Sequence, residues 1–547
     1  MAALLLIALI GVAPLAGEEW TAWRSGPFEV LSDGGEKQAR EVLNAFDQAR
    51  FTLGMLLGKT ELATRWPVRI VVYKPDRQRA GWRTKSLRLV RDRYVAGLER
   101  GAPVPQEFLR DCVRILLEAN TQRMPASIDM GLEELFSTLE ARGNRVTLGA
   151  PPPPERRTRD WARIHRISVD PEYRGRARVF YSNLQQDADR DAAYRNSFGK
   201  REAEMEAEIE RYLAGGQFAA EEIAAKPVNP ESDYRPREVE PATARLAAAD
   251  LVEGEAARIA YQSILNEFPK NPEALEGLGL YTDAAAAGSR AATAWLALGA
   301  SLQEPAKAWD AFQQAGQLNP RWAEPHSRMA SMTKDPQKRI QLWKKAAEIE
   351  PRNARHWQEL AEAELAVKAF ANAAIAWRSA ERAAATAEER ERIRRSRLSY
   401  EERRAGLEEA ERRRLAEEAA REIARLKEDA LREVRAAEAR ANQGAGPASS
   451  RKPVEWWDGP RPTGKASGLL ERVDCVGRTA RLVIRGEARK LMQLAIRDPA
   501  KIVILGGGEQ TLGCGPQKPP RKVTVEYTPQ PDARLGTIGE AALIEFQ

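Results

Sequence analysis

The middle of the chain repeats one short pattern of residues, and this pattern allows few folds. A small residue, an aromatic residue, a further small or apolar residue and then a proline recur in this order, in whole or in part, in four places. Small residues let antiparallel helices approach closely, the aromatic side chain fills the space between helix pairs, and proline ends the second helix. Residues 241–385 are therefore predicted to form an all-α array of helix pairs. The matching positions are Ala257, Tyr261, Ile264 and Pro269; Ala308, Phe312, Ala315 and Pro320; Trp343, Ala346 and Pro351; and Ala373, Trp377 and Ala380.

These units resemble tetratricopeptide (TPR) repeats. The resemblance implies a solenoid that binds a protein or peptide partner on the inner face formed by the first helix of each pair. The proline spacing is uneven, at 51 residues and then 31 against an expected 34, which indicates a degenerate unit at residues 281–299. An irregular helical bundle is the alternative.

Some positions on the predicted inner face are not needed for packing and are candidates for binding a partner. Arg290 and Arg355 can hold a carboxylate of an extended peptide by charge-assisted hydrogen bonds. The alternative is that the array serves only as a spacer or a dimer contact, with these residues solvated. The candidate partner-binding residues are Arg290, Ser327, Arg355, Gln358 and Glu362.

The chain begins with an uncharged apolar segment. Residues 2–17 carry no charge and end in the small residues Ala16 and Gly17, a pattern typical of a signal peptide at residues 1–17. We therefore expect an exported protein, periplasmic or secreted. A buried N-terminal helix or strand is the alternative. No later segment is long and apolar enough to predict a transmembrane helix after cleavage.

Residues 18–215 alternate strand and helix patterns and predict an α+β domain. Strands are expected at 28–33 and 68–73, with helices at 36–57, 105–119 and 126–141. This order and the segment MGLEELFSTLE resemble the peptidase MA-like, gluzincin-type family, whose first helix carries the zinc motif HExxH.

The residues at the family's metal-binding positions do not match its motif. Arg110, Asp111 and Arg114 occupy the HExxH positions, and Met130 occupies that of the third ligand. The chain has three histidines, none of them one helical turn from another. The resemblance therefore implies a degenerate peptidase domain with no catalytic residues, no metal and no cofactor, hence a pseudoenzyme. A simple helical hairpin, or a hydrolase with a non-standard active site, remains an alternative.

Charge suggests a further function only weakly. The net charge of +7 on 547 residues makes nucleic acid an unlikely partner. The segments 74–94 and 156–166 are basic with interleaved aromatic residues. They leave open the binding of a polyanion or an acidic peptide.

The remaining segments are predicted as connectors and one small domain. Residues 216–240 are expected to be a linker, and 386–441 a charged helix, either a solvated spacer that caps the repeats or a coiled coil. Residues 442–453 form a second linker by their Gly, Ser and Pro content.

Short strands separated by turns predict a small all-β barrel or sandwich at 454–547, with an oligonucleotide/oligosaccharide-binding type of barrel as one option. In an exported protein, Cys475 and Cys514 are predicted to form a disulfide, which leaves Cys112 buried on a helix. The whole pattern describes an exported multi-domain scaffold or adaptor.

Overall fold

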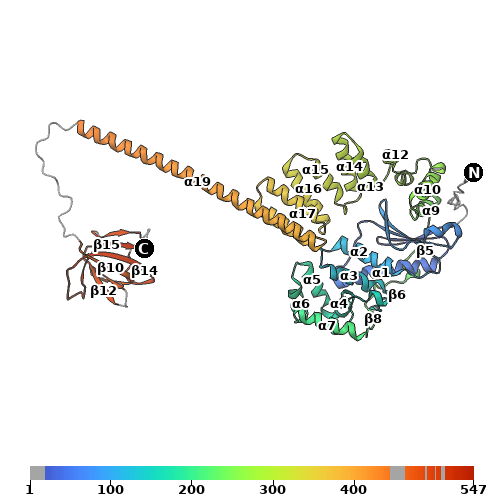
Figure 1. The fold of residues 1–547 in the computed structure, drawn as a ribbon, viewed down its shortest axis with the longest axis horizontal. Helices are drawn as coiled ribbons and strands as arrows, with labels where there is room; N and C mark the ends of the chain where they lie inside the picture. Colours follow the sequence, from blue (N-terminus) through green and yellow to red (C-terminus); the bar gives the residue numbers. More distant parts are fainter. Residues whose placement is uncertain are drawn as a thin grey trace, which may run out of the picture. The chain divides into compact units, whose positions relative to one another are not determined.

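The computed structural model describes residues 19–443, 462–477, 479–486, 490–498, 501–506 and 512–546. It divides after Glu418 into two compact units, which we describe separately (Figure 1). The predicted leader, residues 1–17, and most of the predicted linker 442–453 lie outside the described residues. Among the described residues, no helix combines the length and the apolar character needed to cross a membrane.

A mixed six-stranded sheet forms the centre of the N-terminal domain. Its strand order is β4-β5-β3-β2-β1-β9, with β2, β3 and β5 parallel and the outer strands antiparallel. The strand β3 has the sequence VRIVVY and is buried at every residue, as expected for a parallel strand covered on both faces. The strands are β1 (Thr21–Ser25), β2 (Phe28–Ser32), β3 (Val68–Tyr73), β4 (Arg88–Val90), β5 (Arg93–Glu99) and β9 (Arg237–Glu238).

Helices cover both faces of this sheet. On one face, α1 (Glu36–Leu57), α2 (Gln106–Asn120) and α3 (Ala126–Ser137) bury the larger apolar core. On the other face, α9 (Pro241–Ala249), the first helix of the array, packs its alanines against Trp20, Leu31 and Val71. Gly131 lies where α3 crosses α4, and a Cβ there would overlap Ile164 and the carbonyl of Asp160.

The rest of the N-terminal domain is mostly helical, with one small antiparallel sheet. The predicted linker 216–240 supplies β8, which pairs with β7, and β9, which pairs with β1. Short 3₁₀ helices lie at Arg77–Trp82, Pro154–Arg156 and Arg174–Arg176. The remaining elements are β6 (Glu140–Arg142), β7 (Arg145–Leu148), α4 (Arg159–Ser168), α5 (Ala177–Gln185), α6 (Arg190–Phe198), α7 (Glu202–Gly215), β8 (Glu221–Ile223) and α8 (Pro230–Asp233).

The helical array has the paired, TPR-like character that the sequence predicts. Consecutive helices pack as α13 with α14, α15 with α16, and α17 with α18. The small and aromatic pattern residues Ala308, Phe312, Ala315, Trp343 and Trp377 are buried between them. The predicted degenerate unit, residues 281–299, begins with the six-residue α12 and runs into α13; α11, directly before it, is also only six residues long.

After α9, the array's elements run in order from α10 to α18 (Figure 1). They are α10 (Gly254–Glu267), α11 (Pro272–Gly277), α12 (Tyr281–Ala286), α13 (Ala292–Ser301), α14 (Pro305–Leu318), α15 (Glu324–Met332), α16 (Pro336–Ile349), α17 (Ala354–Ala366) and α18 (Phe370–Ala383).

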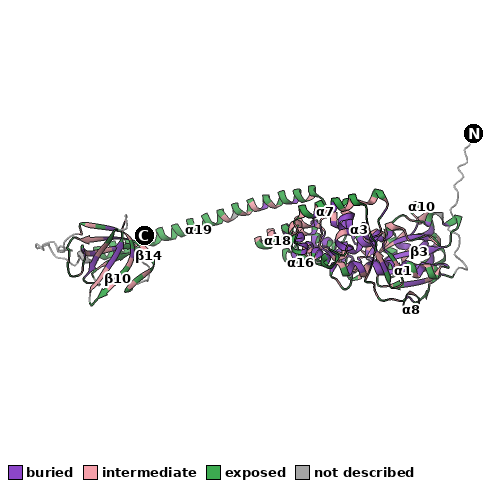
Figure 2. Ribbon diagram, turned by 90° about the horizontal axis from the view of Figure 1, so that it is seen from below, coloured by how far each residue is buried: buried purple, intermediate pink, exposed green. Residues whose placement is uncertain are grey.

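A single helix, α19 (Ala387–Gln443), follows the array. Its first turns cap the repeats, because Ile393 and Tyr400 are buried against α18 and the Tyr400 hydroxyl donates to the carbonyl of Phe370 at 3.1 Å. Further along, the apolar stripe that suggests a coiled coil is solvent-exposed, with Ile423 and Leu426 more than half exposed. Figure 2 shows this exposure as nearly continuous green along α19.

The C-terminal unit contains a small all-β domain. Neighbouring strands pair antiparallel in the order β12-β11-β10-β14-β15, and β15 then pairs parallel with β12 and β13. The pairing of β15 with β12, the first strand in this order, closes the sheet into a barrel, one of the two folds predicted for this segment. The strands are β10 (Gly464–Val476), β11 (Thr479–Arg485), β12 (Leu491–Ile496), β13 (Val503–Leu505), β14 (Gly515–Thr528) and β15 (Gly539–Phe546).

The two cysteines of the barrel form the predicted disulfide. Cys475 lies near the end of β10 and Cys514 directly before β14, with their Cα atoms 5.7 Å apart. Cys112 is free and buried on α2. Burial raises the pKa of its thiol far above the ordinary range.

Candidate functional site

The positions compared with the HExxH motif lie on α2 and α3 and form ion pairs. Arg110 lies 3.9 Å from Glu133 and 3.7 Å from Glu134. Arg114 pairs at 2.7 Å with Asp111, whose second oxygen accepts the backbone amide of Leu87 at 2.8 Å. Both arginines thus neutralise carboxylates of the same helix pair.

The third ligand position of the motif has no polar role here. Met130 is half exposed on the opposite side of α3 from its buried residues. Within the described residues, no three His, Cys, Asp or Glu side chains lie close enough together to hold a metal ion.

Glu133 is the most perturbed carboxyl of this helix pair. Burial raises its pKa to about 7 from an ordinary value of 4.5, against the opposing charges of Arg114 and Arg110. Since the folded state holds this proton more tightly than the unfolded chain, the stabilisation is complete below about pH 4.5 and is lost as the pH rises through 7. Above pH 7 the ionised, buried Glu133 carboxylate therefore lowers the free energy of unfolding, and a neutral glutamine at this position would remove that loss.

We expect Glu133→Gln to raise the free energy of unfolding by about 2 kcal/mol at pH 8 and to leave it nearly unchanged at pH 4. Urea unfolding across this pH range measures the effect. Glu155→Gln, an exposed position in the same domain, is the control and should leave the pH dependence nearly as it is. An equal effect of Glu133→Gln at both pH values would contradict the assignment.

The two basic segments differ in how much free positive charge they present. In 74–94, Arg79, Arg88, Arg91 and Arg93 all form ion pairs. In 156–166, the same holds for Arg156, Arg159, Arg163 and Arg166. By contrast, Lys74, Arg77, Arg83 and Lys85 are exposed and have no ion pair among the described residues, so the first part of segment 74–94 keeps its positive charge at the surface.

The turns that follow the second helix of each pair lie on the N-terminal domain. The turn after α14 contacts residues just before β3, where Trp322 packs edge-on against Trp66 at 5.1 Å between ring centroids. The side-chain amide of Asn319 donates to the backbone carbonyl of Arg65 at 3.0 Å. One edge of the array is thus held by the domain along its length.

The turn between β4 and β5 makes the most polar part of this contact. Asp92 caps the start of α13, accepting the backbone amides of Ala292 at 2.5 Å and Thr293 at 3.0 Å. The hydroxyl of Thr293 donates to the same carboxylate. A side chain about 200 residues earlier in the sequence therefore satisfies the first amides of this helix.

Beside Asp92, buried and partly buried charges join the same turn to the first helices of the array, at the end of α9 and on α11. We call Arg91, Arg93, Asp250, Glu273 and Glu276 the Arg91 cluster. Arg91 pairs with Asp250 and Glu273 at 2.8 Å and with Glu276 at 3.1 Å. Burial alone would lower the pKa of Arg91, but Asp250 and Glu273 reverse this and raise it well above its ordinary value.

The turn after α16 contacts the segment between α2 and α3. Arg352 is buried and donates to both carboxylate oxygens of Asp129, at 2.8 and 3.1 Å. It also donates to the carbonyl and the hydroxyl of Thr121. This bidentate pair fixes α3 relative to α17.

The structure separates the five predicted partner-binding residues. Arg355, Gln358 and Glu362 lie on one face of α17, where Arg355 and Glu362 are exposed and Gln358 partly so. Arg290 is exposed in the turn between α12 and α13. Ser327 is instead buried on α15, with its hydroxyl bonded to the carbonyl of Glu324 at 2.9 Å, and does not offer its side chain to a partner.

Equivalent positions of the last three helix pairs, α13–α14, α15–α16 and α17–α18, explain why Arg355 differs from the others. Thr293, Glu324 and Arg355 occur at intervals of 31 residues, each near the start of a first helix. Thr293 is held by Asp92, and Glu324 by an ion pair with Arg328 at 2.7 Å. Arg355, three-quarters exposed, has only a distant pair with Glu359 at 3.9 Å. Of these three positions, the one on α17 is therefore the most available.

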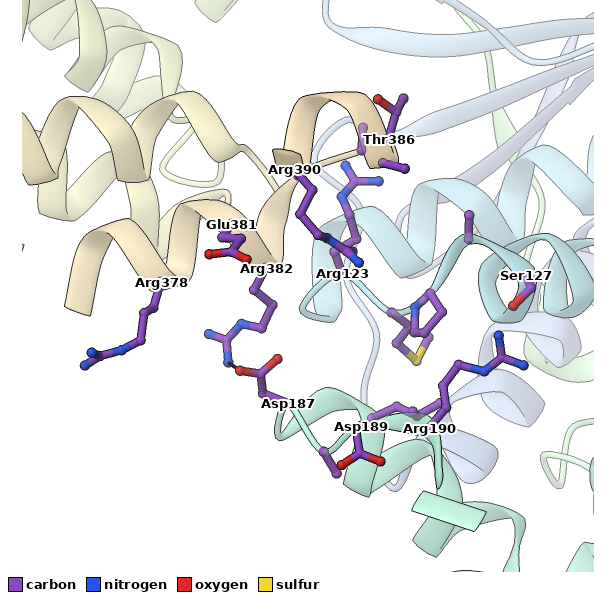
Figure 3. A pocket seen from close by; sticks show the side chains of 18 of the residues that line it. Arg123, Ser127, Asp187, Asp189, Arg190, Arg378, Glu381, Arg382, Thr386 and Arg390 are labelled. Carbon is purple, nitrogen blue, oxygen red and sulfur yellow. Dashed lines mark ion pairs between the residues drawn. The ribbon is translucent and has the colours of Figure 1, made fainter. Parts of the chain in front are cut away.

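A cleft of about 770 Å³ opens between the N-terminal domain and the end of the array. Its walls are the segment between α2 and α3, the turn between α5 and α6, helix α18 and the start of α19 (Figure 3). Six arginines and three acidic residues line it, so that positive charge predominates. These are Arg123, Arg190, Arg378, Arg382, Arg390 and Arg397, with Asp187, Asp189 and Glu381.

The sequence analysis did not identify this cleft. Arg378 and Arg382 are one helical turn apart on α18, and Arg390 and Arg397 two turns apart on α19. This spacing places the two arginines of each pair on one face of their helix, so the sequence does indicate two basic helix faces. Nothing in the sequence shows that Arg123, more than 250 residues earlier, faces the same cleft.

Comparison with known proteins gives a limited result. No family model matches the chain, and no curated protein matches it. Among solved structures, MamA is 22% identical with a TM-score of 0.21, over 24% of this chain and 81% of that one. YrrB, described as a TPR protein with an unusual peptide-binding site, is 16% identical with a TM-score of 0.24, over 28% and 92%. A thermophilic TPR protein of Thermus thermophilus is 22% identical with a TM-score of 0.20, over 26% and 90%.

Proposed function

We propose that this chain is an exported scaffold or adaptor that binds a segment of a protein partner through its helical repeats. One observation carries the proposal: the array is anchored to the N-terminal domain by its turns, while the Arg355, Gln358 and Glu362 face of α17 stays open to solvent. A repeat array buries its small and aromatic residues and presents the remaining side chains for recognition.

The N-terminal domain serves in this proposal as a support for the repeats without catalytic activity. The ion pairs of Arg110 favour this role, because they join α2 to Glu133 and Glu134 of α3, while Arg114 pairs with Asp111 within α2. Export follows from the leader pattern of residues 1–17.

Replacing Arg355 and Gln358 together by alanine tests the site. We expect the recovery of at least one protein captured from the native envelope fraction to fall about tenfold, since charge-assisted contacts contribute about 1.5–3 kcal/mol. Quantitative mass spectrometry of proteins captured by the unmodified chain and the variant measures the loss.

A matched variant controls for charge and handling. Arg235 and Gln217 are exposed outside the repeats, and their replacement by alanine removes the same charge and the same amide. Capture should persist with this control. If every captured protein is recovered equally with both variants, the α17 face is not the binding site.

A further inference from the structure

The cleft between the N-terminal domain and α18–α19 holds more positive charge than its own carboxylates neutralise. Asp187 lies 3.6 Å from Arg382, and Glu381 pairs at 3.1 Å with Arg397. Asp189 caps α6, accepting the backbone amide of Ala192 at 2.8 Å. Each of the three carboxylates in the lining therefore already has a partner.

Three arginines remain without a carboxylate. Arg190 pairs outside the cleft lining with Glu202 at 2.8 Å and Glu206 at 3.0 Å. By contrast, neither Arg378 nor Arg390 has an ion-pair partner within the described part of the chain, and both are exposed. Arg123 is the third, because its guanidinium donates only to backbone carbonyls, those of Ala383 at 2.9 Å and Arg352 at 3.2 Å.

Arg123 lies beside a second guanidinium, that of Arg352. Burial lowers the pKa of its guanidinium, and the neighbouring charge of Arg352 lowers it further. Holding two guanidinium groups close together costs free energy unless an anion lies nearby. The carboxylates Asp129, Glu118 and Glu389 act on the Arg123 pKa in the opposite direction. Asp129, however, is already bound in bidentate fashion by Arg352, and none of the three forms an ion pair with Arg123 among the described residues.

The three unpaired arginines come from three different elements and do not converge on one point. Figure 3 shows Arg378 at one end of the cleft, Arg390 and Arg123 towards the middle, and Ser127 towards the other end. Pro125 is partly exposed and Ala126 and Ala385 are exposed, so they add some apolar surface to the same lining. The arrangement suits an elongated ligand with several separated negative charges and some apolar character, rather than one small ion.

We propose that this cleft binds an acidic peptide segment, an extended chain whose carboxylates pair with Arg123, Arg378 and Arg390. Arginine forms planar, bidentate pairs with carboxylates, which gives both affinity and direction. The cleft volume of about 770 Å³ is sufficient for several residues of such a chain. The proposal does not rest on the α17 face, which is a different surface of the array.

The test uses the full chain and a fluorescently labelled peptide of alternating glutamate and alanine. Binding followed by fluorescence anisotropy should be weakened at least tenfold by the double variant Arg378→Gln and Arg390→Gln, because each removes a charge-assisted contact. Neither arginine has an ion-pair partner among the described residues, so the fold should be retained, and circular dichroism checks this.

The control is the double variant Arg235→Gln and Arg392→Gln. Both residues are exposed, lie outside the cleft and have no ion pair among the described residues, and Arg392 is on α19 itself. The net charge changes by the same amount, so a non-specific attraction would be weakened equally. We expect less than a twofold change, and equal weakening by both variants would overturn the proposal.

A competition arm separates peptide from phosphate. Pyrophosphate should displace the labelled peptide only weakly, and the matching glutamine–alanine peptide should not bind. Tighter binding of pyrophosphate than of the acidic peptide, with loss of both in the Arg378 and Arg390 variant, would overturn the peptide assignment. The α17 variant should bind the acidic peptide normally, so failure of the proposed partner site and failure of this proposal are distinguishable.

Discussion

Arg91→Met is expected to lower the free energy of unfolding of the first unit by at least about 4 kcal/mol. The Arg91 side chain is 7% exposed and pairs with Asp250 and Glu276, which are 0% and 3% exposed, as well as with Glu273. Methionine fills a similar volume but leaves the buried carboxylates short of a counter-charge. The Tyr261 hydroxyl, which donates to Asp250 at 2.6 Å, cannot replace it.

The loss should depend on pH in a defined direction. Although burial alone would raise it, Arg93 and Arg91 lower the pKa of Glu273 to about 2. In the unmodified chain this carboxylate therefore stabilises the fold above about pH 4.5, and the contribution is lost only as the pH falls towards 2. In the variant the carboxylates can take up protons, so the difference between the two proteins should be smaller at pH 4 than at pH 8.

Arg88→Met is the matched control for this experiment. Arg88 lies on the same hairpin and also reaches the segment after α9, but its carboxylate partner Glu253 is 72% exposed. We expect a loss of about 1 kcal/mol for this variant. Urea unfolding followed by tryptophan fluorescence measures both, and equal losses would show that burial of the Arg91 cluster is not what stabilises the contact.

Removal of the Cys475–Cys514 disulfide is the second large effect that we expect. The bridge closes a loop with a sequence separation of 39 residues, which restricts the unfolded barrel by about 4 kcal/mol in the chain-entropy description. The double variant Cys475→Ser and Cys514→Ser should therefore lower the melting temperature of the barrel by at least about 15 °C.

Reductant provides the internal check. It should shift the barrel transition of the unmodified chain to that of the double variant and should leave the variant unchanged, since Cys112 is free and buried in the other unit. A transition that does not respond to reductant would contradict a stabilising role for the bridge. Differential scanning calorimetry resolves the barrel from the first unit.

The repeats and the disulfide were predictable because their signals are local. The spacing of Ala308, Phe312 and Ala315 predicts the packing of paired helices, and all three residues are buried in the structure. The short edge strands β8 and β9 were predicted as linker because EEI and RE carry no alternating apolar pattern. They are strands because β7 and β1 have free edges beside them.

The contacts between the domain and the array were not predictable from the sequence. Asp92 and Arg352 read as ordinary surface charges, and their partners lie about 200 residues away. The same long separation concealed the pairing of Arg91 and Arg93, at the end of segment 74–94, with Asp250 and Glu273. For the candidate sites, helix periodicity placed Arg355 and Glu362 on an exposed face, but it did not foresee the burial of Ser327.

The anchoring of successive turns also bears on how this array can change in length. Isolated repeat arrays gain or lose whole units readily, because each unit contacts only its neighbours. Here the turns before α13 and α17 each have a fixed counterpart on the domain, in Asp92 and Asp129. Duplicating or deleting a unit between them would move every later turn away from its counterpart, so unit number is set by the domain, and variation in length is tolerated only beyond α18.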